Sequence, residues 1–578
     1  MTDKATKDTK NSFMEKLFFS KEISGIGPRA TIKFARSGVT KFFSFIGKMF
    51  SYTSARAYGS FFLSFGLLGL ILRLGEYYFM DQPSVSLSSL IINAVIVLIS
   101  IPFLLSDKPI CIKLQDIKLI EYILFDFLSI KRNNRSDTEY TQISPVLALF
   151  LGFVPALLGF FLSLESVIYT LILVSVVSLA FSSPEFSLVF SLLLLPYYPI
   201  MPFGSLAISF MCILTFISFA VKVMYGKRVY SFDIYDLILI LLALIIFFKG
   251  AADQVNFVEI SLLVITLFIY FPASNLLVNR RLADCVVKSV FVSSVPVVVI
   301  AWIEFFAGAD ILPDFSDGVS VFFTSSSALG SYLLVSAVLA LVFAIEKKRM
   351  FKKLLNYIIF ALQIMTLGII MQPMAWVSAL IGALAYLLVR TRKIPSDLII
   401  ILLFIPYCIY FMPSETIDKV SEFFGITPTY SEKILMYAKS FDRFADNIFF
   451  GQVTISENTN AFNNLLGIGL HFGVFVLALF IIAVIIRLRH IAYYRKYVRP
   501  SLVSVSTDMS TVALVTMLVF GTFSSLFFDR SILTLFVILF GMNASLLKTA
   551  RREYEDRLGY YDLARSAETF IIDIDIEK

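Results

Sequence analysis

The sequence predicts an all-α fold, a polytopic membrane bundle of about 14–16 transmembrane helices, and three observations carry this prediction. Residues AVILMFWYC make up 58% of the 578 residues and DEKR only 16%, whereas soluble proteins have roughly 45–50% and about 25%. The mean hydropathy is +0.84. Apolar runs near the length that a membrane-spanning helix needs recur along the chain. This composition excludes intrinsic disorder, nucleic-acid binding and a disulfide scaffold.

The apolar runs mark the expected helices in chain order. Each is close to the roughly 20 residues that cross a hydrocarbon core, and two of them, 236–249 and 397–412, are short enough to predict tilted or broken helices. The candidate spans cover 58–80, 85–105, 145–164, 166–183, 185–203, 205–223, 236–249, 257–278, 286–306, 325–345, 354–371, 374–390, 397–412, 465–487, 509–528 and 531–547.

Basic residues indicate the orientation of these spans. Of the 49 Lys and Arg residues, 42 lie in the terminal segments and in the connections that a cytoplasmic N-terminus would place inside. Because Lys and Arg are enriched on the cytoplasmic side, the sequence predicts that both termini are cytoplasmic. The one large extracytoplasmic loop then covers 413–464.

The predicted organisation has three parts. A cytoplasmic basic segment, 1–57, precedes a transmembrane domain, 58–547, and a cytoplasmic tail covers 548–578. Within the first part, 31–51 alternates Lys and Arg with Phe, which is typical of an amphipathic helix lying on anionic lipid. An unstructured basic tail is the alternative interpretation of that stretch.

Motifs for nucleotides and metals are absent from the sequence. It has no Walker loop, no dinucleotide-binding fingerprint and no cluster of His and Cys with the spacing of a zinc site. Its four cysteines are far apart, so they offer neither a disulfide framework nor a metal site. We therefore expect no metal and no cofactor.

Of the two histidines, His471 is the stronger candidate for a functional role. It lies in the outer half of the span 465–487, between Gly469 and Gly473, which have the spacing of a close-packing GxxxG pair. Two roles stay open at this point: an interhelical hydrogen bond beside these glycines, or a catalytic or proton-relay function.

Charged residues at membrane depth are few, and each is a functional hypothesis because such a charge is costly there. Arg73 and Glu76 are three residues apart, so they share a helix face and are expected to neutralise each other. Glu304 ends a span on the predicted outer side. It reaches either the membrane interface or an outward-facing cavity.

Cations on the predicted outer side suggest a second kind of site. One interpretation is a solvated, charge-rich loop, and the other is a set of cations that grips a phosphate or pyrophosphate. The candidates for such a grip are Lys433, Lys439, Arg443 and Arg530.

Four stretches between 235 and 545 resemble the O-antigen ligase and O-antigen polymerase superfamily of polytopic membrane glycosyltransferases. In the last of them, Asn463 is followed by Leu466 at +3 and Gly473 at +10, a spacing similar to that family's H-N-x-x-L loop and following glycine. The stretches are Tyr270–Gly308, Phe322–Leu333, Leu367–Arg390 and Arg443–Phe475.

The chain departs from the family pattern at the positions that carry chemistry. Phe462 stands where the family has His, and Pro373 follows Gln372 where the family has Arg after Ser. Ser325 and Ser327 match the two Asn of the N-P-N box. Since Phe cannot accept a proton and Pro cannot pair with phosphate, the family mechanism does not carry over unchanged. Pro373, between two closely spaced spans, predicts an outward helical hairpin instead.

The resemblance implies transfer or polymerisation of a glycan from an undecaprenyl-pyrophosphate-linked donor, on the outer face of a bacterial plasma membrane. The activated donor needs no metal and no cofactor. In this interpretation Arg443, Arg530, Lys439 and Lys433 bind the pyrophosphate. The candidate catalytic residues are Glu304, Asp446, Glu457 and His471.

Three functions stay open at this point. In the first, the protein is an active, metal-independent glycosyltransferase. In the second, catalysis is lost, and the protein binds glycan lipid as a scaffold partner of other polysaccharide-assembly membrane proteins. The third is a transporter of lipid-linked glycans, which would predict internal repeats that the sequence does not show.

Overall fold

The computed structural model describes residues 22–23, 53–79, 87–128, 143–161, 163–201, 204–252, 257–307, 323, 325–346, 350–370, 373–391, 430–451, 463–497, 505–524, 526–545 and 548–549. The basic stretch 31–51, the candidate span 397–412, Phe462, Glu457 and the tail beyond 549 lie outside these residues, as does the side chain of Lys433.

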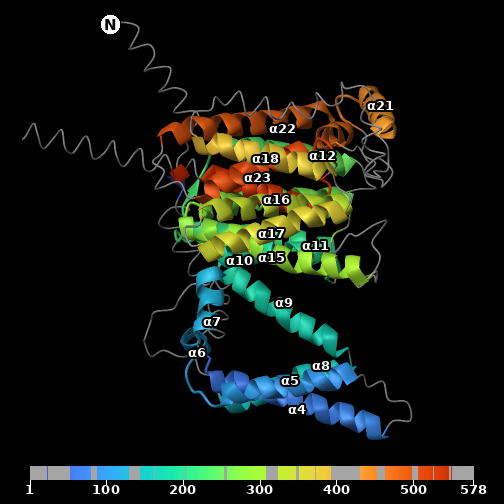
Figure 1. Cartoon of the computed structure of the whole chain (residues 1–578). Coiled ribbons are helices and arrows are strands. Elements are labelled where there is room, and N and C mark those ends of the chain that lie inside the picture. The colour runs from blue at the N-terminus through green and yellow to red at the C-terminus, as the bar shows by residue number, and fades with distance from the viewer. Residues whose placement is uncertain are drawn as a thin grey trace, which may run out of the picture. The chain divides into compact units, whose positions relative to one another are not determined.

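The described residues are almost all helical (Figure 1). Among them, nine helices are long and apolar enough to cross a membrane, which confirms a multi-pass helical membrane protein. Their number in the whole chain and their sidedness stay predictions. These spans lie in α4 (Ala55–Phe79), α5 (Leu87–Leu104), α9 (Leu164–Ser182), α11 (Gly204–Met224), α12 (Ile234–Ala252), α13 (Phe257–Leu267) with α14 (Tyr270–Leu276), α15 (Arg280–Ala307), α16 (Ser326–Glu346) and α22 (Asn464–Tyr497).

Shorter helices complete the described part of the chain. The shorter apolar helices are α8 (Pro145–Phe161), α17 (Met350–Ile369), α18 (Pro373–Thr391), α23 (Val505–Phe520) and the helix Arg530–Ser545. The others are α6 (Ile110–Asp116), α7 (Lys118–Glu121), the π-helix η1 (Tyr122–Phe127), α10 (Pro184–Leu194), the 3₁₀ helix η2 (Leu195–Ile200) and α21 (Tyr430–Asp446).

Two predicted spans are broken by proline. The run 185–203 forms α10 and then η2, because Pro196 and Pro199 have no N–H to continue an α-helix. The run 257–278 divides into α13 and α14, and Pro272 lies within the second piece. Pro373 has the opposite effect, since it begins α18. This confirms that Pro373 marks a helix boundary rather than the middle of a continuous helix.

The chain forms two compact units. Unit 1 comprises 1–23, 188–216 and 229–578, and unit 2 comprises 24–187 and 217–228. In unit 2, α4 packs along α5 and α8, and a small core joins Phe65, Ala156, Leu164 and Val167.

The predicted pairing of Arg73 with Glu76 in unit 2 is confirmed. Arg73 Nη1 lies 2.9 Å from Glu76 Oε2, and Arg73 Nη2 donates to the carbonyl oxygen of Gly159 at 2.8 Å. Both side chains are largely buried, so the two charges neutralise each other between α4 and the end of α8. The pair therefore has a structural role between these two helices.

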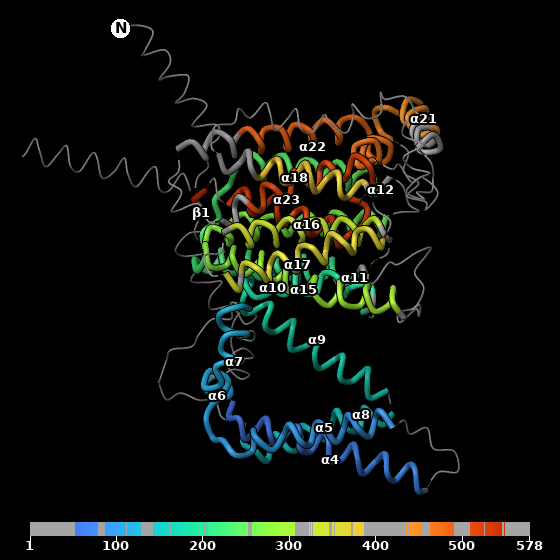
Figure 2. The backbone as a smooth tube through the Cα atoms, viewed as in Figure 1, coloured from blue at the N-terminus to red at the C-terminus, as the bar shows by residue number. Residues whose placement is uncertain are grey.

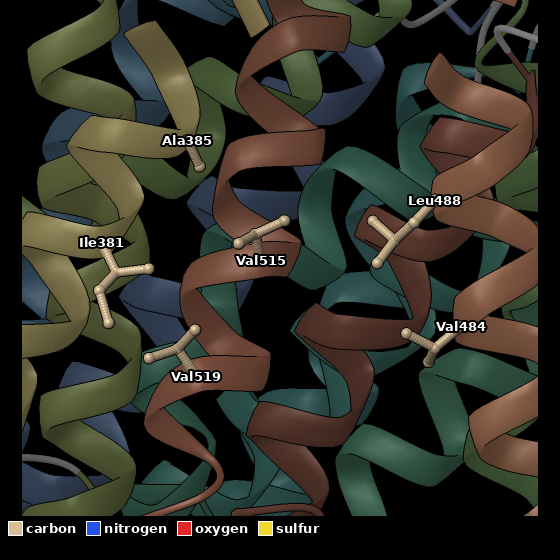
Figure 3. Close-up of a cluster of buried hydrophobic side chains, with 6 residues drawn as sticks. All are labelled: Ile381, Ala385, Val484, Leu488, Val515 and Val519. Carbon is tan, nitrogen blue, oxygen red and sulfur yellow. The ribbon is translucent and has the colours of Figure 1, made fainter. Parts of the chain in front are cut away.

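In unit 1, α22, α18, α23, α16 and α17 run side by side (Figure 2). Aliphatic residues from α18, α22 and α23 form a core between them (Figure 3): Ile381, Ala385, Val484, Leu488, Val515 and Val519. Unit 1 has two ends, which we name by the elements that lie there. The strand end holds the start of α12. The α21 end holds the end of α12 and the start of α22.

At the strand end, two short strands close the bundle. Strand β1 (Glu22–Ile23) pairs antiparallel with β2 (Tyr230–Ser231). Lys548 Nζ donates to Ser231 O at 2.7 Å and to Asn275 Oδ1 at 3.1 Å. Burial raises the pKa of Tyr230, and the neighbouring Asp236 raises it further, so Tyr230 stays protonated and donates to Asp236 Oδ2 at 3.0 Å.

A buried polar network joins α15, α16 and α17. Gln363 Nε2 donates to Ser294 Oγ at 2.9 Å and to Ser336 Oγ at 2.8 Å, and Ser336 Oγ donates to Ser294 Oγ at 2.7 Å. All three side chains lie in buried residues. Because no water competes inside a membrane bundle, these bonds fix how the three helices pack.

We expect Gln363→Ala to lower the free energy of unfolding by about 1–3 kcal/mol, since interhelical hydrogen bonds in membranes contribute about 0.6–1.7 kcal/mol each. The measurement is unfolding of the purified protein in mixed micelles. Leu362→Ala is the control, because that side chain is 38% exposed on the same helix. Equal losses in both variants would contradict a structural role for the network.

Candidate functional site

A kink divides α22 at Gly473. This residue has φ +82° and ψ 174°, a conformation that only glycine adopts readily, and it separates a short first helix from the long remainder. A Cβ built at Gly473 would lie 2.2 Å from Phe449 O, so the turn after α21 approaches the kink too closely for any side chain. Val474 N donates to Ile448 O at 2.8 Å, which ties that turn to the kink.

The GxxxG interpretation of this helix is therefore wrong for Gly473. Its role is conformational, because its backbone has left the helix and faces the turn Asn447–Gly451. Gly469 does allow close packing, since a Cβ there would lie 3.2 Å from Phe444 Cε2 on α21. Spacing alone cannot distinguish these two uses of glycine.

The kink directs a backbone carbonyl toward a cation. Lys249 Nζ, at the end of α12, donates to His471 O at 2.6 Å. The His471 side chain is 5% exposed, and its ring lies 4.8 Å from the ring of Phe528 in an edge-on arrangement. His471 thus lies at the α21 end of unit 1, beside an aromatic residue and one residue from the short helix's end.

Two asparagines begin α22 and hold it in place. Asn463 Oδ1 accepts from Leu465 N at 2.8 Å and from Leu466 N at 3.3 Å, which makes Asn463 the helix cap. Asn464 Oδ1 accepts from Leu526 N at 2.5 Å and from Phe527 N at 3.1 Å. The family-like spacing of Asn463, Leu466 and Gly473 therefore corresponds to a cap, the first turn and a kink.

We expect Asn464→Ala to lower the free energy of unfolding by about 2–6 kcal/mol, because two buried N–H groups each lose an acceptor at about 1–3 kcal/mol. Thermal unfolding in detergent measures this loss. Asn447→Ala, an exposed asparagine at the end of α21, is the control. If both variants unfold alike, Asn464 does not tether the connection 521–527.

Arg530 lies at the same end of unit 1. It is 8% exposed and forms an ion pair with Glu259 of α13, whose side chain is 60% exposed. Asp529 Oδ1 accepts from Ser531 N at 2.8 Å and from Ile532 N at 3.1 Å, so Asp529 caps the helix Arg530–Ser545. This cap fixes Arg530 in the first turn, where it points toward α13.

An apolar cavity of about 100 Å³ runs between α12, α13, α14, α22 and the helix Arg530–Ser545. Near the α21 end it is lined by Ile468, Phe472 and Phe528, and near the strand end by aromatic residues. Its lining is almost wholly hydrocarbon, which suits a lipid chain better than a sugar.

At the strand end of the cavity, the lining aromatic residues contact a buried arginine. Arg487 is 1% exposed, its guanidinium lies 3.5 Å from the ring centre of Tyr235 and 4.8 Å from that of Phe540, and Nη2 donates to Tyr270 Oη at 3.0 Å. These contacts hold the three aromatic rings that close the cavity. Arg487 is the last residue of the predicted span 465–487, and it was not among the candidate site residues predicted from the sequence.

Helical spacing could have identified Arg487. Val476, Phe480 and Val484 line the cavity at intervals of four residues, and Arg487 follows Val484 by three, so it shares their face of α22. The predicted span ended at 487, whereas α22 continues as a helix to Tyr497.

The other predicted residues divide between two places. Arg530, His471, Asn463, Leu466 and Gly473 all lie in the short first helix of α22 or beside it. Lys439, Arg443 and Asp446 are exposed on α21, and Glu304 lies on α15, which contributes nothing to the cavity lining. Within the described part of the chain, no three His, Cys, Asp or Glu side chains could hold a metal ion.

No protein-family model matches the chain, and no curated protein matches it.

Proposed function

We propose that this protein belongs to cell-surface polysaccharide assembly and acts as an O-antigen ligase- or polymerase-like glycosyltransferase. Its donor would be an undecaprenyl-pyrophosphate-linked glycan on the outer face of a bacterial plasma membrane. The observation that carries this proposal is the apolar cavity with cations at one end. An amphiphile with a hydrocarbon chain and an anionic head has that distribution of properties.

Two cations, Lys249 and Arg530, each lie within one helical turn of a lining residue at the α21 end. Lys249 follows Ile246 by three residues, and Arg530 precedes Leu533 by three, where Ile246 and Leu533 line the cavity. Each cation therefore lies about one helical turn beyond a lining residue, although neither cation lines the cavity itself. The isoprene units next to the pyrophosphate would enter the cavity, and the pyrophosphate would lie near Lys249 and Arg530.

Both cations have partners that a pyrophosphate can displace. Glu259 is largely exposed, and an ion pair with an exposed carboxylate contributes about 1 kcal/mol or less. Arg530 Nη1 has no hydrogen-bond partner within the described residues. Lys249 Nζ donates a hydrogen bond to His471 O, a neutral acceptor that is weaker than a phosphate oxygen.

In the proposed reaction, a hydroxyl group of the acceptor sugar attacks the anomeric carbon of the donor. The bond from that carbon to the pyrophosphate oxygen breaks, and undecaprenyl pyrophosphate leaves with the electron pair. A base takes the hydroxyl proton, for which Glu304, Asp446, Glu457 and His471 are the candidates. His471 is the described candidate whose neighbour Phe472 lines the cavity.

A non-catalytic partner that binds glycan lipid is the second candidate function. The observation that favours it is the loss of the family's His and Arg at Phe462 and Pro373, together with the position of Pro373 at the start of α18. A cavity that holds a prenyl chain serves binding as well as transfer. The two functions differ in whether the bond between the anomeric carbon and the pyrophosphate oxygen is broken.

The test places purified protein in lipid with an undecaprenyl-pyrophosphate oligosaccharide and follows release of free undecaprenyl pyrophosphate. Wild type runs beside Arg530→Ala and Arg443→Ala. Release that is lost in Arg530→Ala supports the transferase, and binding without release across several acceptors supports the non-catalytic partner. If the wild type neither binds nor releases the lipid, both functions are wrong.

A further inference from the structure

Large apolar side chains are exposed at the α21 end of unit 1. Phe441 is 60% exposed, Ile448 42%, Phe449 61%, Phe450 77% and Phe475 54%. We call these four phenylalanines and Ile448 the aromatic shoulder. A cluster of this kind on a protein surface marks an interaction site for another apolar surface.

The shoulder continues the surface of a membrane-spanning helix. Phe475 lies on α22, two residues beyond the kink, within the candidate span Asn464–Arg489. The ring of Phe449 lies 6.0 Å from that of Phe475, and the bond from Val474 N to Ile448 O fixes the turn against the helix. Lipid covers the exposed side of a spanning helix, so the same lipid extends over Phe449.

Helix α21 presents different chemistry on its two sides. At 100° per residue, Lys439 and Arg443 each lie about 160° around the axis from Phe441. Both basic residues are exposed, and so is Phe441. Between these sides, Phe444 contacts the short first helix of α22 at Gly469, which anchors α21 to the bundle. This division is typical of a helix that lies in the plane of a membrane interface.

We propose that the aromatic shoulder is inserted into the bilayer interface, with α21 lying flat among the lipid headgroups. The occupant of this surface is lipid, with Phe449 and Phe450 among the upper parts of the acyl chains. Lys439 and Arg443 then face the headgroups and water. This inference assigns a membrane-binding surface and does not depend on the substrate proposed above.

The insertion sets the depth of the cationic end of the cavity. Ile448 O is bonded to Val474 N, and Lys249 Nζ to His471 O, three residues earlier in the chain. The shoulder and Lys249 are therefore held at one level of α22. If the shoulder lies at the interface, Lys249 lies near the depth of lipid phosphate groups rather than in bulk water.

Spin labels report this depth directly. The background is the full-length protein with its four cysteines replaced by serine. Three variants, Phe450→Cys, Phe475→Cys and Lys439→Cys, each carry one nitroxide label. Each labelled protein is placed in lipid vesicles. We expect the labels at 450 and 475 to be reached by oxygen more than by a water-soluble nickel complex. The label at 439 should show the reverse preference. All three side chains are exposed, so a nitroxide can be attached at each position.

Two results would overturn the proposal. Nickel access at 450 equal to that at 439 would place the shoulder in water. Protection of 450 from both reagents would place another protein surface over it. If the cysteine-free protein does not fold, Phe450→Trp and Lys439→Trp in the native background give the same comparison, because brominated lipid should quench the added fluorescence only at 450.

Discussion

Gly473→Ala is expected to destabilise unit 1 by about 2–6 kcal/mol, the sum of a positive φ and of forced repacking. The Cβ would lie 2.2 Å from Phe449 O, a backbone atom that cannot move alone because Ile448 O holds Val474 N. The short first helix of α22 would lose its position, and with it Ile468 and Phe472 at the end of the cavity. Chemical unfolding in micelles measures the loss.

Gly75→Ala is the matched control for that experiment. A Cβ at Gly75 meets nothing within 4 Å, and the residue lies inside α4. Alanine favours a helix over glycine by about 1 kcal/mol, so this variant should be neutral or slightly more stable. A Gly473→Ala protein as stable as Gly75→Ala would show that α22 does not need its kink.

Arg530→Ala should reduce release of undecaprenyl pyrophosphate by about 10²–10³-fold, the loss typical of removing one stabilising donor from a developing oxyanion. Fold should be retained, because the Glu259 side chain left behind is largely exposed to solvent. Initial rates at saturating donor measure the effect. Lys249→Ala should act in the same direction, since Lys249 lies at the same end of the cavity.

Arg228→Ala is the control for a lost arginine. Arg228 pairs with Glu185 in unit 2, so this variant also removes one partner of an Arg–Glu pair, at a residue that does not line the cavity. Its rate should match the wild type. Equal loss in Arg228→Ala and Arg530→Ala would mean that the effect comes from stability and not from the substrate.

Features that depend on a single segment of the chain could be predicted from the sequence. Apolar runs predicted most helices, since a spanning helix satisfies its own backbone. Arg73 and Glu76 were predicted as a pair because three residues bring them to one helix face. Pro373 was predicted at a helix boundary because it lies between two closely spaced apolar runs, and its missing N–H is tolerated in the first turn of α18.

The site depends on contacts between distant segments, which residue spacing does not encode. Lys249 on α12 donates to His471 O two residues before the kink at Gly473, although 222 residues separate Lys249 from His471 in the chain. Arg487 is buried because Tyr235, Tyr270 and Phe540, from separate elements, meet around it. Asn464 could not be distinguished from Asn463 in sequence, yet it holds the connection 521–527 and Asn463 only caps its own helix.

Occupation of the apolar cavity is the central claim, and a cavity-filling pair of variants tests it most directly. Ala483 lines the cavity, and its neighbour Ile482 is 46% exposed on the outside of α22. The measurement is equilibrium binding of undecaprenyl pyrophosphate to Ala483→Trp, Ile482→Trp and wild type in lipid nanodiscs. We predict at least tenfold weaker binding for Ala483→Trp and unchanged binding for Ile482→Trp. Equal affinity in all three proteins would contradict a prenyl chain in this cavity.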